Sequence, residues 1–566
     1  MRSSGKKTRV ANLATVLLGL SSSVAAQAVP DAGAFQRRIE QERQAALPSR
    51  GQPEPETAPL PPPMRNRGGA RIVVDHFTFV GAHAVDEQTL RAAVSPLLGR
   101  PLDFDELRAA PRAVAAAYRR AGWVVRAYLP AQDIRGGVVA IQVVEARFGQ
   151  VHTTGRIRHA RERQIVEMAT APLAPGRLVK GAALDRGLLL AGDTPGVSVA
   201  GALGPGARER ETDLTLRLAD RPLASGMVSL DNGGERATGA MRASAAVTLA
   251  GLLGRGDALE ATAIHSRGSD YVGGRASAPA GSSGLRIAVA GSYLHYRLTA
   301  PDYASLGATG ESVVAGVEAR YPLVRARTRN LFLEIRYQHK AYRNEASGVI
   351  VSRYAVDEGE AALSGNLFDR LGGADTASLS ATIGALELGG SPNAAVDALT
   401  TRAAGRFGKI AYRVGRRQAF GPDVTASVEA FGQVASKNLD SSEKIYLGGP
   451  DGVRAYPTNE AGGAEGEIVE TAIERRLPGH VTVAGFYDWG HVRINTDNRY
   501  VGAPAVNAES LQGPGLAVTW RPTPGAWLRA TWSHRLGTNP NPTASGLDQD
   551  GSLLRNRFWL SASVGF

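Results

Sequence analysis

The side chains that carry out most enzyme chemistry are missing from this chain or lack the spacing that such chemistry needs. The 566 residues include no cysteine, which excludes thiolate metal sites, cysteine nucleophiles and disulfides. The ten histidines are scattered without metal-ligand spacing, and neither an HExxH nor a GxSxG motif occurs. Residues 251 to 256, GLLGRG, lack the Lys-Ser/Thr pair of a phosphate-binding loop and read as a turn. We therefore expect no enzyme, no metal and no cofactor.

One cation stands out by its surroundings. Residues 447 to 457, LGGPDGVRAYP, place Arg454 among three glycines and two prolines. Glycine and proline interrupt regular structure, so Arg454 is expected in a loop. The segments on both sides of this loop alternate apolar and polar residues. The partner of an isolated cation in such a loop depends on what those segments build.

The first 28 residues have the three parts of a secretory signal. A basic start precedes an apolar run from Val10 to Leu20, and Ala26-Gln27-Ala28 is a small-residue cleavage site. A soluble N-terminal helix is the alternative interpretation. No later stretch approaches 18 consecutive apolar residues, so any membrane role would be carried by strands. The net charge of +12 is spread along the chain without a polybasic run, which argues against a nucleic-acid partner.

A polar helix is predicted next, within residues 29–48. Asp31 can cap it, Phe35 and Ile39 share one face, and Pro48 ends the pattern. Its other faces carry arginines, glutamates and glutamines, so a polar surface or lumen suits it better than a protein core. Residues 49–70 are rich in proline and predict a stiff, extended linker.

Two small αβ modules follow. Residues 71–147 predict a strand, two helices and a pair of strands joined by the turn QDIRGG. Residues 148–221 predict the same order, with helices near 160–170 and 181–192. Because the same order of strands and helices occurs twice, we expect two domains in tandem.

The remaining residues, 222–566, have the pattern of a transmembrane antiparallel β-barrel. Segments of about ten residues alternate in hydrophobicity between clusters of Gly, Pro, Asn and Asp. Sixteen strands would leave about 21 residues for each strand and its connection, which fits short and long turns in alternation. Closure of the sheet would also remove its exposed edges. The last strand ends at Phe566, which resembles the carboxyl-terminal aromatic signal that the barrel assembly machinery recognises.

Four motifs in order resemble the two-partner secretion transporters of the ShlB/FhaC/HecB haemolysin secretion and activation family. Residues 117–146 resemble part of a POTRA domain, and residues 230–259 resemble the family's first hairpin. GVRAYP (452–457) and GFYDWGHV (485–492) resemble two motifs shared more widely by barrels with POTRA domains. The match runs over nearly the whole chain.

The resemblance implies α+β periplasmic POTRA domains, here 71–147 and 148–221, before an outer-membrane barrel of 16 strands. It implies that the helix of residues 29–48, with Phe35 and Ile39, plugs the pore. It also implies that the long loop 439–465 folds into the lumen, where Arg454 meets Asp488 on the inner wall. The loop motif comprises Gly452, Val453, Ala455 and Tyr456, and the wall motif comprises Gly485, Phe486 and Gly490.

The strand register agrees with this position of Asp488. Val481, Val483, Tyr487 and Trp489 share the lipid-facing parity, so Asp488 points inward. An ion pair away from bulk water depends on both partners, so we interpret it as a latch that fixes the loop; ordinary surface positions are the alternative. The family often has glycine where this chain has Ala455. If the loop needs a positive φ there, alanine would be strained.

The resulting functional hypothesis is export of one cognate exoprotein without nucleotide hydrolysis. An unfolded exoprotein would add a strand to a POTRA sheet edge and then thread the polar lumen. Its partners would be that exoprotein, outer-membrane lipid and the barrel assembly machinery. An outer-membrane protein insertion factor remains the main alternative. A passive porin would not need residues 71–221, a β-propeller adhesin would need a blade-length repeat, and the polar helix could be a mere spacer.

Overall fold

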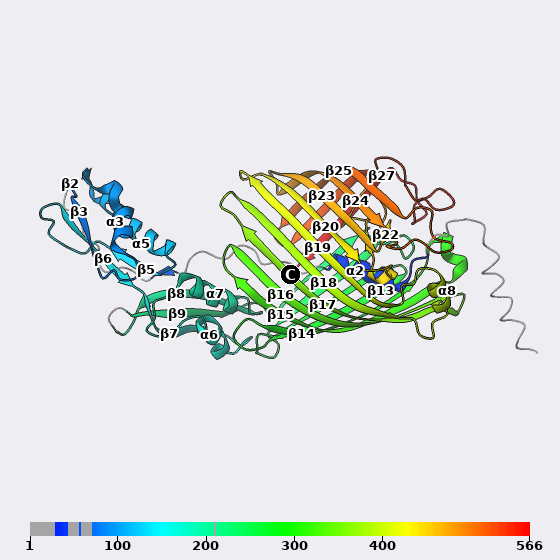
Figure 1. Ribbon diagram of the computed structural model, residues 1–566, viewed down its shortest axis with the longest axis horizontal. Helices are drawn as coiled ribbons and strands as arrows, with labels where there is room; N and C mark the ends of the chain where they lie inside the picture. Colours follow the sequence, from blue (N-terminus) through cyan, green and yellow to red (C-terminus); the bar gives the residue numbers. More distant parts are fainter. Residues whose placement is uncertain (1–28, 44–55, 58–70, 209–210) are drawn as a thin grey trace, which may run out of the picture.

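A computed structural model describes residues 29–43, 56–57, 71–208 and 211–566. The predicted signal peptide (1–28), the end of the predicted helix (44–48) and all of the predicted linker except 56–57 lie outside the described residues. Two small αβ domains stand beside the end of a large barrel (Figure 1). None of the helices in these described ranges is both long and apolar enough to cross a bilayer.

The first αβ domain packs its helices on one face of a three-stranded sheet ordered β3-β6-β5, with β3 parallel to β6. Val139, Ile141 and Val143 alternate along β6 and are buried against the helices. Asp86 and Asp103 cap two of the helices through their side chains. Its elements are β2 (Ile72–Val73), β3 (His76–Val80), α3 (Glu87–Val94), η1 (Ser95–Leu97), β4 (Pro101–Leu102), α4 (Phe104–Leu107), α5 (Ala109–Arg120), β5 (Val125–Tyr128) and β6 (Val138–Glu145).

The second αβ domain has the strand–helix–helix–strand–strand order that the sequence predicts. Its sheet runs β1-β8-β9-β7, and the short strand β1 adds to β8 in parallel at residues 202 and 203. A strand from the predicted linker therefore covers one edge of this sheet. The elements are β1 (Glu56–Thr57), β7 (Arg147–Arg156), α6 (Glu162–Thr170), α7 (Gly181–Gly192), β8 (Val197–Pro205) and β9 (Glu211–Asp220).

A short extended segment joins the two domains. The amide of Val124 in the first domain donates to the carbonyl of Val179 (3.0 Å). The amide of Val179 in turn donates to the carbonyl of Ala146 (2.8 Å), between β6 and β7, and the Phe148 amide at the start of the second domain donates to the Arg177 carbonyl (2.9 Å). Residues 177–180 thus pair with the backbone of both domains.

Sixteen antiparallel strands close into the barrel, and β10 pairs with β27 to complete it. The predicted fold class is therefore confirmed. The strands are β10 (Ala224–Asp231), β11 (Arg242–Ala250), β12 (Ala258–Ser266), β13 (Ser269–Pro279), β14 (Arg286–Arg297), β15 (Thr309–Arg325), β16 (Arg329–Ala346), β17 (Val349–Phe368), β18 (Gly373–Glu387), β19 (Gly405–Phe420), β20 (Val424–Ala435), β23 (Glu465–Leu477), β24 (Val481–Arg493), β25 (Ala508–Thr523), β26 (Ala526–His534) and β27 (Asn556–Gly565).

The outer face of the barrel carries the apolar side chains of each alternating strand. In β27, Phe558, Leu560 and Val564 are 62%, 58% and 59% exposed, as lipid-facing residues of an isolated chain should be. Several strands are longer than the predicted ten residues: β16 has 18 and β17 has 20. On the outer face, the carboxylate of Asp357 on β17 accepts a hydrogen bond from exposed Tyr337 and pairs with His339, as expected of strand residues outside a hydrocarbon layer.

Loops at the two ends of the barrel differ in length. The turns beside the αβ domains are short, whereas four long connections lie at the opposite end (Figure 1). Two outer turns, 267–268 and 347–348, are as tight as the turns at the near end, so the alternation of short and long is incomplete. The long connections are 388–404 with α8 (Ala394–Leu399), 436–464 with η3 (Ser441–Glu443), β21 (Ile445–Tyr446) and β22 (Gly462–Gly463), 494–507 and 535–555; η2 (Pro301–Leu306) lies in 298–308.

Ion pairs fasten the second αβ domain to the barrel rim. Arg325, at the end of β15, makes two hydrogen bonds of 2.7 and 2.8 Å to Asp193 at the end of α7. Arg327, two residues on, pairs with Asp185 of α7. The open end of the barrel is thereby held beside the αβ domains.

Candidate functional site in the barrel lumen

Helix α2 (Ala32–Glu42) lies inside the barrel (Figure 1). Asp31 caps it by accepting a hydrogen bond from the Ala34 amide (2.9 Å). Burial, followed by the charge of Asp440, raises the pKa of Asp31 to about 6. The helix begins after Asp31 as predicted, but it ends at Glu42, before the predicted end at Pro48.

The helix seats its two large apolar side chains in an aromatic part of the inner wall. Phe35 and Ile39 are 6% and 8% exposed, and the Phe35 ring lies 4.7 Å from that of Tyr296. Tyr342 and Tyr354 stack nearby in the same buried cluster. The wall beneath α2 is therefore more apolar than the polar lumen that the sequence predicts.

Hydrogen bonds fix the polar faces of α2 around the lumen. The wall residues come from four strands, and the remaining partners come from the long connection 436–464, which we call the arginine loop. The contacts are Ala32 N to Asn344 Oδ1 (2.9 Å), Ser312 Oγ to Gln36 Oε1 (3.1 Å), Gln36 Nε2 to Ser292 Oγ (3.4 Å), Arg37 Nε to the Lys444 carbonyl (3.1 Å), Ser441 Oγ to Asp31 (2.7 Å) and Arg43 Nη1 to Tyr271 Oη (2.6 Å).

A buried ionic cluster joins α2, the arginine loop and the wall. Glu443 of the loop pairs with Lys340 (3.1 Å) and with Lys409, and Lys340 also lies 3.4 Å from Glu40 of α2. Glu443 and Lys340 are each 1% exposed. Burial raises the pKa of Glu443, but the two lysines outweigh it and hold this pKa below its ordinary value. The carboxylate is therefore charged.

The arginine loop folds back into the lumen. Leu447, Val453 and Tyr456 are almost completely buried and pack with Ile468, Val492 and Leu511 of the wall. Gly452 permits the tight turn, because a Cβ there would lie 2.1 Å from the Leu447 carbonyl oxygen. The loop begins and ends at 436 and 464, close to the predicted 439–465.

At the centre of this loop, Arg454 makes a two-pronged ion pair with Asp488 of β24. Arg454 Nε and Nη2 donate to the two carboxylate oxygens at 2.7 and 2.5 Å, and the Arg454 amide donates to Asp488 Oδ2 at 3.1 Å. The guanidinium stacks 3.4 Å from the ring centroid of Phe486. Burial lowers the pKa of Arg454, but Asp488 outweighs burial and raises it above its ordinary value. The pair joins the arginine loop to the barrel wall.

The same loop also spans the closure between the first and last strands. Ser533 Oγ and Trp559 Nε1 donate to the Arg454 carbonyl at 2.6 and 2.8 Å. On the other side of the closure, Thr458 donates to the Gly233 carbonyl (2.9 Å) and Asn459 to Glu235 (2.6 Å). The sequence analysis did not predict these contacts. Ser533 is a small residue on the inward face of β26, and this was a signal for its contact with the Arg454 carbonyl.

The far side of the loop rests on the connection 535–555. The guanidinium of Arg535 lies 4.3 Å from the ring centroid of Tyr456, and Arg535 pairs with fully buried Asp548. Glu460 accepts hydrogen bonds from Asn539 (2.7 Å) and from the Gln549 amide (2.9 Å). Burial and the charge of Asp548 raise the pKa of Glu460 to about 8.

Ala455 does not need the glycine conformation. Gly449, Asn459 and Ala461 take positive φ in the loop, at 119°, 65° and 58°, and Ala455 is not among the residues with positive φ. Ala455 is fully buried against Gly513, where an added Cβ would lie 2.5 Å from the Ala455 methyl group. The room for alanine is therefore made by a glycine on β25, the strand next to Asp488.

Of the remaining motif residues, Gly490 lies under the loop and Gly485 does not. A Cβ on Gly490 would meet Val453 and Leu447 at 3.1 and 3.2 Å, whereas a Cβ on Gly485 would meet only Leu516, at 3.9 Å. Phe566 lies at the closure, where its amide donates to the Gly226 carbonyl (3.0 Å). Its exposed ring covers Gly226.

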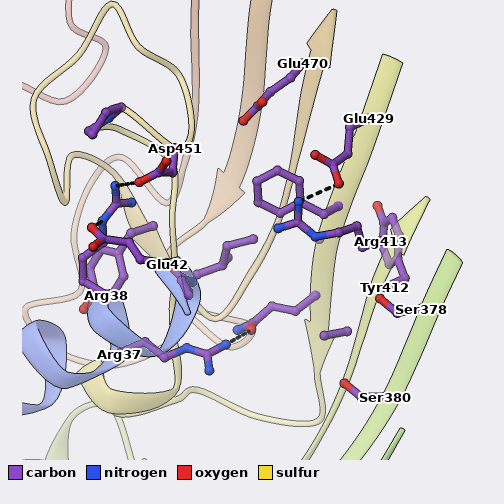
Figure 2. Close-up of a pocket in the computed structure, with 18 of the residues that line it drawn as sticks. Arg37, Arg38, Glu42, Ser378, Ser380, Tyr412, Arg413, Glu429, Asp451 and Glu470 are labelled. Carbon is purple, nitrogen blue, oxygen red and sulfur yellow. Dashed lines mark hydrogen bonds and ion pairs between the residues drawn. The ribbon is translucent and has the colours of Figure 1, made fainter. Parts of the chain in front are cut away.

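A cavity of about 400 Å³ remains between α2, the arginine loop and the wall. Figure 2 shows Arg37, Arg38 and Asp451 on one side of it and Arg413 and Glu429 on the other. Its lining mixes charges of both signs, which suits water or a passing chain. Among the residues that the structure describes, no group of three His, Asp or Glu side chains could hold a metal ion.

Comparison with known proteins matches this architecture. The family model for the haemolysin secretion/activation protein ShlB/FhaC/HecB matches residues 210–508, more than half of the chain. The ShlB-type POTRA domain model matches residues 72–146. The heme/hemopexin transporter protein HuxB of Haemophilus influenzae is 23% identical over 555 residues, 96% of each chain. Outer membrane transporter CdiB of Escherichia coli O6:K15:H31 is 27% identical over 294 residues, 51% of this chain and 47% of CdiB.

Solved structures share the fold. CdiB from Escherichia coli superposes with a TM-score of 0.64 at 19% identity, covering 94% of this chain and 98% of that one. BamA from Haemophilus ducreyi, without POTRA domains 1–3, superposes with a TM-score of 0.57 at 11% identity, covering 88% of this chain and 100% of that one. The barrel lies in the bacterial outer membrane and the POTRA domain in the periplasm. The chain belongs to the haemolysin secretion/activation family ShlB/FhaC/HecB.

Proposed function

We propose that this two-partner secretion transporter exports one cognate exoprotein through its barrel, without nucleotide hydrolysis or any catalytic step. The observation that carries the proposal is a sixteen-stranded barrel whose lumen holds a separate helix and an inward loop, both seated by polar contacts. A permanent structural core would not need so many charged groups. In this proposal α2 is a plug that leaves the lumen before the exoprotein passes.

The POTRA domain and the second αβ domain, which we propose is a second POTRA domain, would receive the exoprotein in the periplasm. Strands β3 and β5 are the edges of the first sheet, and β7 is the edge of the second sheet opposite β1. An unfolded chain can add to such an edge by backbone hydrogen bonds. The edge of β8 is already covered by β1, so we assign the incoming strand to one of the other edges.

Arg454 and Asp488 are proposed as a latch that keeps the arginine loop in its inward position. Their geometry supports this role because a two-pronged, buried ion pair is lost when either partner is removed. Phe566 is proposed as the assembly signal that the barrel assembly machinery reads. The apolar outer band supports outer-membrane lipid as the remaining partner.

The second candidate is an insertion factor for other barrels, favoured by the shared fold of BamA. Deletion of the gene in its native bacterium separates the two. A secretion transporter predicts that one large protein disappears from the culture medium while other outer-membrane barrels keep their levels. An insertion factor predicts a reduction of many barrels, and that result would overturn the proposal.

A variant in which α2 can be cross-linked to the wall, introduced into the deletion strain, then tests whether α2 must leave the pore. Because the chain has no cysteine, Gln36→Cys with Ser312→Cys introduces a unique thiol pair at side chains that now touch. Joining this pair with a short, reducible bifunctional thiosulfonate should stop secretion, and reduction should restore it. Thiosulfonate treatment of the single variant Ser312→Cys is the control. Continued secretion by the joined variant would exclude α2 as a plug.

A further inference from the structure

Three ion pairs connect α2 to the rest of the described chain. Glu42 pairs with Arg242 of β11, Glu40 with Lys340 of β16, and Arg38 with Asp451 of the arginine loop. The Asp451 side chain is 60% exposed, so water can solvate it when α2 is absent. Arg242 and Lys340 are largely withdrawn from water, with side chains 16% and 1% exposed. These two cations decide what it costs to remove the helix.

Arg242 is shared between the helix and the wall. One edge of its guanidinium donates to Glu42 of α2, with Nη1 at 3.0 and 3.2 Å from the carboxylate oxygens. Its Nε donates to Asp231 of β10 at 2.9 Å. Asp231 and Arg242 are directly opposite in the β10–β11 ladder, so this second pair does not depend on the helix.

Lys340 is shared in the same way. Its Nζ lies 3.4 Å from Glu40 of α2, but only 2.9 Å from Glu358 of β17 and 3.1 Å from Glu443 of the arginine loop. Glu358 is 8% exposed. The wall and the arginine loop therefore each supply a carboxylate for Lys340 whether or not the helix is seated.

The helix carries its own replacement partners. Glu42 is 2.8 Å from Arg38, one turn away, and Glu40 accepts from Gln36 (3.2 Å) and lies 3.7 Å from Arg37. Removing one member of a buried ion pair is strongly unfavourable when the other member is left uncompensated. Here the departure of α2 leaves a partner beside each buried cation of the wall and beside each glutamate of the helix.

We propose that Asp231 and Glu358 are release residues, which hold Arg242 and Lys340 when α2 leaves and thereby set how readily the lumen opens. The inference rests on the proposed function, in which α2 leaves during transport. It assigns to these two carboxylates a role that differs from holding the seated helix. They stabilise the open state, in which α2 has left the lumen, because they remain as partners of Arg242 and Lys340.

The arrangement predicts opposite effects for two carboxylates on the same arginine. Glu42→Gln removes attraction only while the helix is seated, so the lumen should open more often. Asp231→Asn keeps an oxygen for the Arg242 and Gly233 hydrogen bonds but removes the charge that balances Arg242 in the open state. The cation then depends on Glu42, so the helix should be retained. Lys340 gives an independent pair of variants. Glu40→Gln should raise the open fraction, and Glu358→Gln should lower it.

The measurement is the open fraction of single full-length channels in planar bilayers. We expect about a fivefold increase for Glu42→Gln and for Glu40→Gln, and about a fivefold decrease for Asp231→Asn and for Glu358→Gln. Asp375→Asn is the matched control, because Asp375 pairs with Arg416 and contacts no residue of α2. Its open fraction should equal that of the natural chain.

A variant that lacks residues 31–43 distinguishes the possible failures. If this variant opens no more often than the natural chain, α2 is not a plug, and the plug role in the proposed function fails together with the inference. If it does open, but the wall and helix carboxylates shift the open fraction in the same direction, only the sharing of cations is overturned. The heat-dependent electrophoretic shift of folded barrels verifies assembly of every variant. If Glu42→Gln or Asp231→Asn does not assemble, the test rests on Glu40→Gln and Glu358→Gln.

Discussion

Asp488 holds Arg454 by three hydrogen bonds, one from the loop backbone and two from the guanidinium, and is itself fully buried. Removal of either charge should release the arginine loop, because the remaining charge lacks a partner at a cost of about 3–5 kcal/mol. We expect secretion to fall at least about tenfold in Arg454→Ala and in Asp488→Asn. Secretion in the native bacterium, with protease sensitivity of the loop, measures this effect.

Arg454→Lys refines the same prediction. Lysine keeps the charge but cannot donate two parallel hydrogen bonds to a carboxylate, so it should rescue little. Arg499→Ala is the control, since Arg499 forms an exposed ion pair with Asp497 in another loop. Normal secretion by both Arg454→Ala and Asp488→Asn would refute the latch.

Gly513→Ala should disturb the loop from the wall side. The new methyl group would lie 2.5 Å from the Ala455 methyl group and 2.3 Å from the His534 carbonyl oxygen, and neither can move freely. Overpacking of this kind costs about 1–3 kcal/mol. We expect a lower temperature for the heat-dependent electrophoretic shift. Gly274→Ala, whose new methyl group would meet its nearest atom at 3.8 Å, should leave that temperature unchanged.

Glu145 predicts a pH dependence in the first POTRA domain. Burial raises the pKa of Glu145, but hydrogen bonds from the His83 and Ala84 amides and from Tyr118 outweigh it, so this pKa is lower than in the unfolded chain. The stabilisation is complete above the unfolded pKa and is lost as the pH falls through the lower, folded value.

Hydrogen exchange of the His83 and Ala84 amides in the full chain measures this dependence. After correction for the intrinsic rate, protection should decrease as the medium is acidified through the range in which carboxylates titrate. Glu145→Gln should weaken protection by about 1–3 kcal/mol at neutral pH and remove the acid dependence. Protection that is constant with pH in the natural chain would contradict the assignment.

Phe566 is predicted to act at assembly. Its ring is 72% exposed on the lipid side and its backbone extends the β10–β27 pairing by hydrogen bonds to Gly226. Phe566→Ala should reduce the amount of assembled barrel severalfold, and Phe566→Tyr should retain most of it. Heat-dependent mobility of outer-membrane extracts gives the assembled fraction. Equal amounts for all three chains would show that the aromatic ring is not read.

Much of the architecture follows from periodicity alone. The main order of strands and helices in both αβ domains and the inward parity of Asp488 need only hydrophobic periodicity, which is a local property. The short strands β2 and β4 of the first domain and the division of its second predicted helix into α4 and α5 were not predicted. The greater length of β16 and β17 was not predicted, because residues beyond the hydrocarbon layer alternate like those within it. Strand β1 was missed because two residues of a proline-rich segment carry no period.

The contacts within the lumen were harder to predict. Lys340 and Glu443 are 103 positions apart, and they meet only because the arginine loop folds into the lumen. Glu358 lies on the adjacent strand β17, but its pairing with Lys340 depends on the register of the two strands. The expected Arg454–Asp488 contact came from a family resemblance, while the parity of β24 supplied only the direction of Asp488. The room for the Ala455 methyl group could not be predicted, because Gly513, which provides it, lies far away in the sequence on β25.

The segment 177–180 has a mechanical consequence. Because it is hydrogen-bonded to the backbone on both sides of the domain junction, bending there would break main-chain bonds at Val179. We therefore expect the two αβ domains to move as one body, attached to the barrel rim by the pairs of Asp193 with Arg325 and of Asp185 with Arg327. A force applied to the first domain would then be transmitted to the rim.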